Sequence, residues 1–168
     1  FLRDINKSKM QCMELQEYYN KSNLDYAWEE LLWAFRSLED YKQTYSKFDF
    51  TDMLTQYVAF GPTPALDVVI VDEAQDLTKL QWNMCEKIWQ NAKRVYISGD
   101  DDQAIFRWAG ADIEHLITMQ GNVSVLNQSY RCPVEVHKVA HDIVTRINQR
   151  RNKEWNPRDV EGEVRFHA

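Results

Sequence analysis

The sequence has few of the features that mark secreted, metal-binding or membrane proteins. Cysteine occurs only 3 times, and Cys12, Cys85 and Cys132 lack the close spacing of metal-binding pairs. We therefore expect free thiols in a reducing compartment. No apolar run is long enough to cross a membrane and no secretion signal is apparent, so we expect no membrane association. The sequence also has no internal repeat and no low-complexity segment.

Positive charge is also scarce. The 20 Lys and Arg residues against 26 Asp and Glu residues leave a formal net charge of −6. This balance argues against a uniformly basic coat for nucleic acid, although a local basic groove remains compatible with it. The 168 residues suffice for one domain or parts of two, and a hydrophobic content of 44% permits a packed core. The 6 Trp residues favour large buried contacts or stacking surfaces.

The N-terminal quarter has a helical pattern. Between Leu24 and Leu38, apolar residues recur at alternating four- and three-residue steps, which predicts one apolar stripe within a helical region over residues 8–45. Ser22 followed by Asp25 resembles a capping box at the start of this stripe.

Gly and Pro residues at 61–64 break the chain, and a different pattern follows. Residues 66–71 form a short, Val- and Ile-rich run, which predicts a strand buried on both faces of a parallel sheet. Strands and helices then alternate, which predicts an α/β layer with right-handed crossovers. The further strands are expected at 94–98, 123–126 and 163–166, and the helices at 78–91, at 111–119 with Asp112 as cap, and from Pro133 to about Arg150.

An abrupt change from apolar to acidic residues marks the end of the first predicted strand. Residues 69–76 have the sequence VIVDEAQD, which places Asp72 and Glu73 at the edge where open α/β sheets bind ligands. Phosphoryl transfer needs Mg²⁺ and a group that orients water, and neighbouring side chains at a strand end point in different directions. Asp72 is therefore the better metal ligand and Glu73 the better water activator. An acidic pair alone would equally suit the start of a helix.

Three ordered segments resemble motifs of superfamily 1 DNA helicases of the UvrD, Rep and PcrA type. Residues 72–76 (DEAQD) resemble motif II, the Walker B element. Residues 99–108 (GDDDQAIFRW) resemble motif III, and residues 128–133 (QSYRCP) resemble motif IV. Residues 48–54 predict a cap and the first turn of another helix. This segment also resembles the one that precedes motif II, so the resemblance covers about 48–162.

This resemblance implies an internal piece of an ATP-driven motor. Residues 1–47 would end a helical 1B-like subdomain, residues 48–122 would form the second half of the first RecA-like P-loop NTPase domain, and residues 123–168 would begin the second RecA-like domain. The sequence lacks a Gly-x-x-x-x-Gly-Lys-Ser/Thr loop for phosphate. We expect that loop upstream of Phe1, and we expect the isolated chain to be inactive.

The resemblance also implies ATP and Mg²⁺ as cofactors, and it assigns roles in motif II. Asp72 would coordinate Mg²⁺, Glu73 would activate the attacking water, and Gln75 would couple the nucleotide to DNA.

In motifs III and IV, four further residues would contact the nucleotide. Gln103 would sense the γ-phosphate, because an amide can donate to a phosphate oxygen, and Asp100 would lie beside it. Tyr130 would stack on adenine. Arg131 would reach the γ-phosphate as a planar, permanently charged clamp.

The aromatic residues of motif III would stack on bases of single-stranded DNA, and duplex junctions would be the substrate. Phe106 and Trp108 match those positions, where stacking is worth about 1–3 kcal/mol per base; ordinary core packing is the alternative for both. Relatives usually carry Gly before this Trp and Arg after it, whereas Arg107 and Ala109 stand here.

The parent protein would thus be a DNA-stimulated ATPase that moves on single-stranded DNA, from 3′ to 5′ by resemblance. The resemblance further implies a bacterial or phage-encoded protein in the cytoplasm, associated with the nucleoid.

Two alternatives to the helicase motor stay open. One is a metal-dependent nuclease that uses the motif II carboxylates with Asp100 and Asp101. The other is a DNA-binding or protein-interaction module whose ATPase has decayed. His137 and His141 lie one helical turn apart, but no Glu completes a zinc-protease pattern around them.

Overall fold

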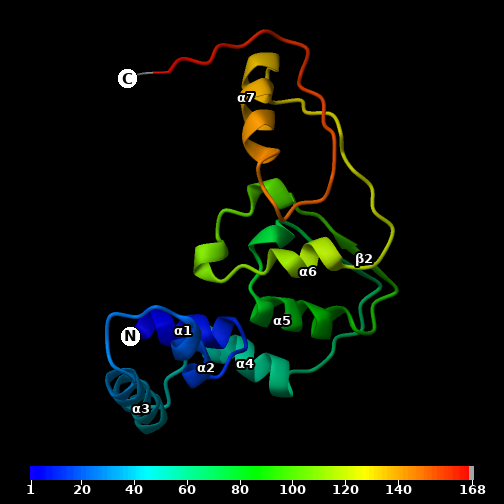
Figure 1. The fold of residues 1–168 in the computed structure, drawn as a ribbon. Coiled ribbons are helices and arrows are strands. Elements are labelled where there is room, and N and C mark those ends of the chain that lie inside the picture. Colours follow the sequence, from blue (N-terminus) through cyan, green and yellow to red (C-terminus); the bar gives the residue numbers. More distant parts are fainter. Residues whose placement is uncertain (167–168) are drawn as a thin grey trace. The chain divides into compact units, whose positions relative to one another are not determined.

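The computed structural model describes residues 1–166, and the chain divides into two compact units (Figure 1). The first unit contains residues 1–100 and 104–113, and the second contains residues 101–103 and 114 onward. The helices of the first unit are α1 (Leu2–Met10), α2 (Leu15–Lys21), α3 (Trp28–Thr44), α4 (Phe50–Phe60) and α5 (Lys79–Trp89). Its strands are β1 (Val68–Val71) and β2 (Arg94–Ile97). It also contains the 3₁₀ turns η1 (Ala74–Asp76) and η3 (Arg107–Ala109). The second unit holds the 3₁₀ turn η2 (Asp101–Gln103), α7 (Val134–Val144) and nearly all of α6 (Ile113–Thr118).

The helical prediction for residues 8–45 is confirmed in part. Turns at 11–14 and 22–27 divide the region, so it contains the end of α1, then α2 and α3. The predicted capping box at Ser22 is wrong, because α3 begins only at Trp28. Glu30 instead accepts a hydrogen bond from the backbone N–H of Ala27 at 2.9 Å, which satisfies one free donor at the helix start. Leu31, from the predicted stripe, is fully buried.

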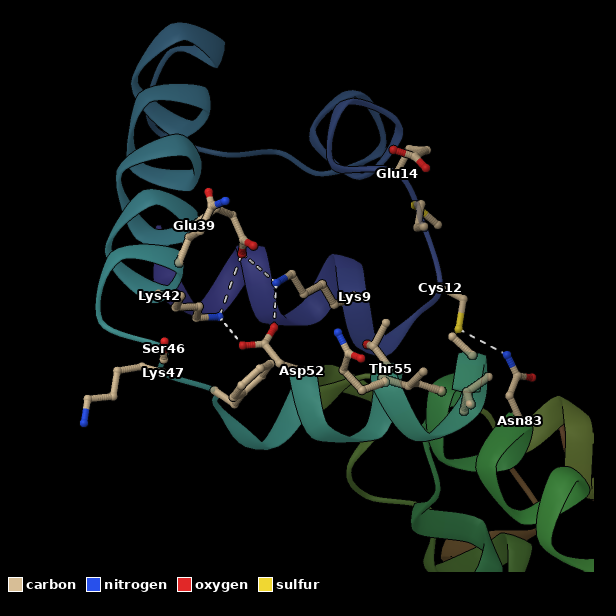
Figure 2. A pocket seen from close by; sticks show the side chains of 17 residues that line it. Lys9, Cys12, Glu14, Glu39, Lys42, Ser46, Lys47, Asp52, Thr55 and Asn83 are labelled. Atoms are coloured by element: carbon tan, nitrogen blue, oxygen red, sulfur yellow. Dashed lines mark hydrogen bonds and ion pairs between the residues drawn. The ribbon is translucent and has the colours of Figure 1, made fainter. Parts of the chain in front are cut away.

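A charged cluster joins α1, α3 and α4 (Figure 2). The ammonium of Lys42 lies 2.6 Å from Asp49 and 2.7 Å from Asp52, and that of Lys9 lies 3.0 Å from Asp52 and 2.8 Å from Glu39. Asp49 also caps α4, since its carboxylate accepts the backbone N–H of Asp52 at 2.8 Å. The predicted cap and first turn at 48–54 are therefore confirmed. The cluster forms one wall of an open pocket of about 880 Å³.

The two strands form a parallel pair, in the register Val68 with Arg94 and Val71 with Ile97. Both strand predictions are confirmed, but the expectation of burial on both faces is wrong. The side chains of Ile70 and Tyr96 are 74% and 55% exposed, because no described element covers that face of the sheet. The opposite face is half-buried.

Helix α5 confirms the prediction for 78–91 and anchors the chain after motif III. Thr78 caps the helix, and its backbone N–H donates to the side chain of Gln81 at 2.8 Å. Trp82 is fully buried, and its indole N–H donates to the carbonyl of Asp112 at 3.3 Å. The backbone N–H of Asp112 donates to the carbonyl of Leu77 at 2.8 Å, so this segment is fixed to the start of α5.

Two strand predictions fail in the second unit. Residues 123–126 and 163–166 are both described, and neither is a strand. The apolar residues at 123–126 are exposed, Leu126 most of all, because no described strand lies beside them to complete a ladder. Pro133 directly precedes α7, which ends at Val144 rather than near 150. Among the described helices, none is long and apolar enough to span a membrane.

Candidate functional site

The ends of the two strands bring Asp72 and Ser98 together. Asp72 directly follows β1 and Ser98 directly follows β2, so the parallel pairing places both at one edge of the sheet. The Ser98 hydroxyl donates to the Asp72 carboxylate, and the backbone N–H of Glu73 donates to the same oxygen at 3.0 Å. These hydrogen bonds, that of Ser98 first, hold the pKa of Asp72 below its usual value. The sequence analysis missed Ser98, although a hydroxyl after the second strand was the available signal.

The buried amide of Gln75 connects motif II to motif III. Gln75 is 2% exposed, and its side-chain amide donates to the Glu73 carboxylate at 2.7 Å. Its side-chain carbonyl accepts the backbone N–H of Asp100 at 3.0 Å. Glu73 itself has a left-handed backbone with a φ of 52°. That conformation is uncommon for a residue with a side chain, and such residues cluster at functional sites.

An ionised, exposed carboxylate at a sheet edge suits a magnesium ion. Mg²⁺ in proteins usually takes one or two carboxylates and completes its shell with water and substrate phosphates. Asp72 fits this coordination pattern, because it is exposed and its hydrogen bonds favour the charged form. Within residues 1–166, no three His, Cys, Asp or Glu side chains gather into a larger metal-binding group.

Trp108 lies beside cationic residues of α1. Its side chain is 68% exposed, and it borders a hollow of about 240 Å³. The ring centroids of Phe106 and Trp108 are 6.4 Å apart. Exposed aromatic rings next to positive charge are what single-stranded nucleic acid requires from a protein surface. The other residues that line the hollow are Arg3, Asn6, Lys7, Met10 and Ala109.

The motif IV residues lie in the second unit on a polar turn. The Ser129 hydroxyl accepts the backbone N–H groups of Arg131 and Cys132 at 3.3 and 3.0 Å. The turn leaves the side chains of Tyr130 and Arg131 exposed. Gln103 is also exposed and belongs to the second unit, in η2. The described contacts thus gather the motif II residues with Asp100, whereas Gln103, Tyr130 and Arg131 are held by other elements.

The chain is similar to known DNA helicases. A family model described as the UvrD/REP helicase N-terminal domain matches residues 1–124. A probable DNA helicase II homolog of Mycoplasma genitalium is 30% identical over 135 residues, which are 70% of this chain and 19% of that protein. The ATP-dependent DNA helicase PcrA of Bacillus subtilis is 28% identical over 95 residues, 53% of this chain and 13% of that protein.

A second PcrA, from Staphylococcus aureus, is 30% identical over 88 residues, 49% of this chain and 12% of that protein. The matched regions therefore span at most 19% of the length of these relatives. The family model itself covers residues 1–124 of the 168. The chain therefore belongs to the UvrD/REP helicase N-terminal domain family.

Proposed function

We propose that this chain carries the metal-binding and water-activating part of the ATP site of a DNA helicase. The hydrogen-bonded carboxylates Asp72 and Glu73 at the edge of a parallel sheet are the observation that supports this best. We infer that β1 and β2 are strands of a RecA-like sheet, because parallel strands with carboxylates at their C-terminal edge are where α/β proteins bind ligands. The names of the relatives agree, since PcrA is an ATP-dependent DNA helicase.

In this proposal, Asp72 holds Mg²⁺ and Glu73 accepts a proton from the attacking water. Magnesium would neutralise charge that develops on the transferred phosphoryl group. The hydrogen bond from Gln75 orients the Glu73 carboxylate, and its 2.7 Å length is that of a charge-assisted bond. Gln103, Asp100 and Arg131 would approach the phosphates and Tyr130 the adenine, as the resemblance implies. None of these residues supplies a phosphate-binding loop, so we expect the chain alone to hydrolyse no ATP.

Single-stranded DNA would lie over Trp108. The exposed indole offers a stacking surface, and Arg3 and Lys7 line the same hollow with cations that suit a phosphate. Phe106 lies beside Trp108 and would extend the surface. Gln75 would pass the state of the ATP site to motif III through its bond to Asp100. Movement from 3′ to 5′, and the use of duplex junctions in DNA repair, follow from the resemblance alone.

The nuclease alternative has less support. It needs several carboxylates around metal ions, and no such group of three gathers within the described residues. The decayed-ATPase alternative also has less support. It gives no functional reason for the hydrogen bonds that join Asp72, Glu73 and Gln75.

The test is ATP hydrolysis by the full-length protein, with and without single-stranded DNA. Glu73→Gln keeps the size of the side chain but removes the base, so we expect ATP binding to persist and hydrolysis to fall by about 10² or more. Glu17→Gln is the matched control, because Glu17 forms an exposed pair with Lys21 on α2. A Glu73→Gln protein that retains wild-type hydrolysis would refute the role of Glu73. Wild-type protein without DNA-stimulated hydrolysis would refute the motor function.

A further inference from the structure

Salt bridges from Arg150 and Lys153 hold the centre of motif III in the second unit. The guanidinium of Arg150 donates to both carboxylate oxygens of Asp102, at 2.7 and 2.9 Å. Side-chain exposure is 13% for Arg150 and 7% for Asp102, so the pair is largely shielded from water. The ammonium of Lys153 pairs with Asp101 and lies 3.4 Å from Asp102. Two acidic residues of η2 are thus matched by two basic residues about fifty positions later in the chain.

The segment that supplies these cations is itself fixed. The backbone N–H of Arg151 donates to Asp101 at 2.5 Å. Its guanidinium donates to the carbonyls of Leu116, Ile117 and Met119, at 3.3, 2.7 and 3.2 Å. Leu116 and Ile117 lie at the C-terminal end of α6 and Met119 directly follows it. A helix end leaves carbonyl acceptors without partners and favours positive charge. Residues 150–153 therefore bind α6 on one side and η2 on the other.

The two ends of motif III are held differently. Asp100 belongs to the first unit and donates its N–H to Gln75, whereas Asp101–Gln103 belongs to the second unit. Gln103 directly follows Asp102, so the bidentate pair with Arg150 restricts the backbone that carries Gln103. A largely buried pair is weak grounds for added stability, because desolvation offsets much of the attraction. The bidentate geometry of the pair, which fixes the position of Asp102, is therefore more informative about its role than a contribution to stability.

We propose that Arg150 and Lys153 are positioning residues for motif III, which hold Gln103 in place through Asp102 and Asp101. The inference rests on the proposed function, in which Gln103 senses the γ-phosphate. Through these salt bridges, any displacement of residues 150–153 would also move Gln103. The second unit would therefore influence hydrolysis through this salt-bridged segment as well as through motif IV.

The test uses the full-length protein and compares Arg150→Ala, Asp102→Ala and the double variant. We expect each single variant to lower the kcat of DNA-stimulated hydrolysis by roughly tenfold or more, with a smaller change in the KM for ATP, since misplacing one group is costly in a preorganised site. The double variant should be no worse than either single one, because both remove one interaction. Arg165→Ala is the matched control, since it removes an exposed bidentate pair with Glu163 in the same unit.

Two further variants separate positioning from folding. Arg150→Lys keeps the charge but loses the bidentate geometry, so we expect an intermediate kcat. Exchanging the partners, with Asp102→Arg and Arg150→Asp together, should recover part of the kcat that either reversal alone loses. Losses that add in the double variant, or that match the fraction of unfolded protein in a thermal melt, would overturn the inference. So would an Arg150→Ala protein within twofold of wild type. Wild-type protein that shows no DNA-stimulated hydrolysis would instead refute the proposed function.

Discussion

Gln75 accepts a hydrogen bond from the backbone N–H of Asp100 at 3.0 Å, although 25 positions separate the two residues. The other end of the same amide donates to Glu73 at 2.7 Å. An amide is the only neutral side-chain group that offers a carbonyl acceptor and N–H donors together. Gln75 therefore joins the proposed base of motif II to the first acidic residue of motif III.

Removing this link should uncouple hydrolysis from DNA. Gln75→Leu keeps a similar size and loses both hydrogen bonds. We expect DNA-stimulated kcat to fall about tenfold, the loss typical of one hydrogen bond to a charged group. The measurement is ATP hydrolysis by the full-length protein across a titration of single-stranded DNA. Gln120→Leu is the control, because that exposed amide donates to the nearby carbonyl of Thr118. Equal DNA stimulation in both variants would contradict the role of Gln75.

Trp108 should contribute directly to DNA binding. Trp108→Ala in the full-length protein is expected to weaken binding of an oligo-dT strand by about 1–3 kcal/mol, the value of one stacked base. Fluorescence anisotropy at fixed salt measures the change. Trp33→Ala provides a matched control, because Trp33 is also an exposed indole, lies on α3 and does not line the hollow beside Trp108. The stacking role fails if both variants bind the strand equally well.

Lys7 should contribute through charge alone. Lys7→Gln is expected to weaken strand binding and to reduce the slope of log K against log salt by about 0.7, since one phosphate contact is lost. Repeating the oligo-dT titration at several salt concentrations gives this slope. Lys21→Gln is the comparison, because Lys21 is exposed on α2 and pairs with Glu17. An unchanged slope for Lys7→Gln would show that no phosphate binds there.

The charged cluster around Asp52 should make stability depend on pH. Burial opposes ionisation of Asp52, but hydrogen bonds from Lys42, the Asp49 backbone and Lys9 outweigh it and lower its pKa to about 2, from 3.8. The folded-state pKa is thus the lower one, so the stabilisation is present above about pH 4 and is lost as the pH falls toward 2. Asp52→Asn should reduce the fall in unfolding free energy over this range by about 2 kcal/mol.

Chemical denaturation of the chain at several pH values measures that effect. Asp40→Asn is the control, because Asp40 is exposed on the same helix that carries Lys42. We expect the control to keep the wild-type pH dependence. If Asp52→Asn keeps it as well, the cluster does not set the acid sensitivity of the fold.

Local patterns in the sequence were enough to find most of the regular elements of the first unit. The apolar runs that became β1 and β2, the helix at 78–91 and the cap and first helical turn at 48–54 depend on neighbouring residues, and these expectations are confirmed. The strand expected at 123–126 is not observed, because a strand depends on a neighbouring strand as well as on its own residues. A strand needs a partner for its backbone groups, and none of the described chain provides one there.

The sequence alone determined the family, because residues 1–124 match the family model. It also placed Asp72 and Glu73 after a strand, since that depends only on chain order. Only the tertiary structure decided the partners of these groups. Ser98 reaches Asp72, and Arg150 reaches Asp102, across 26 and 48 positions of sequence. Such pairs depend on which elements pack together, and no local periodicity records that information.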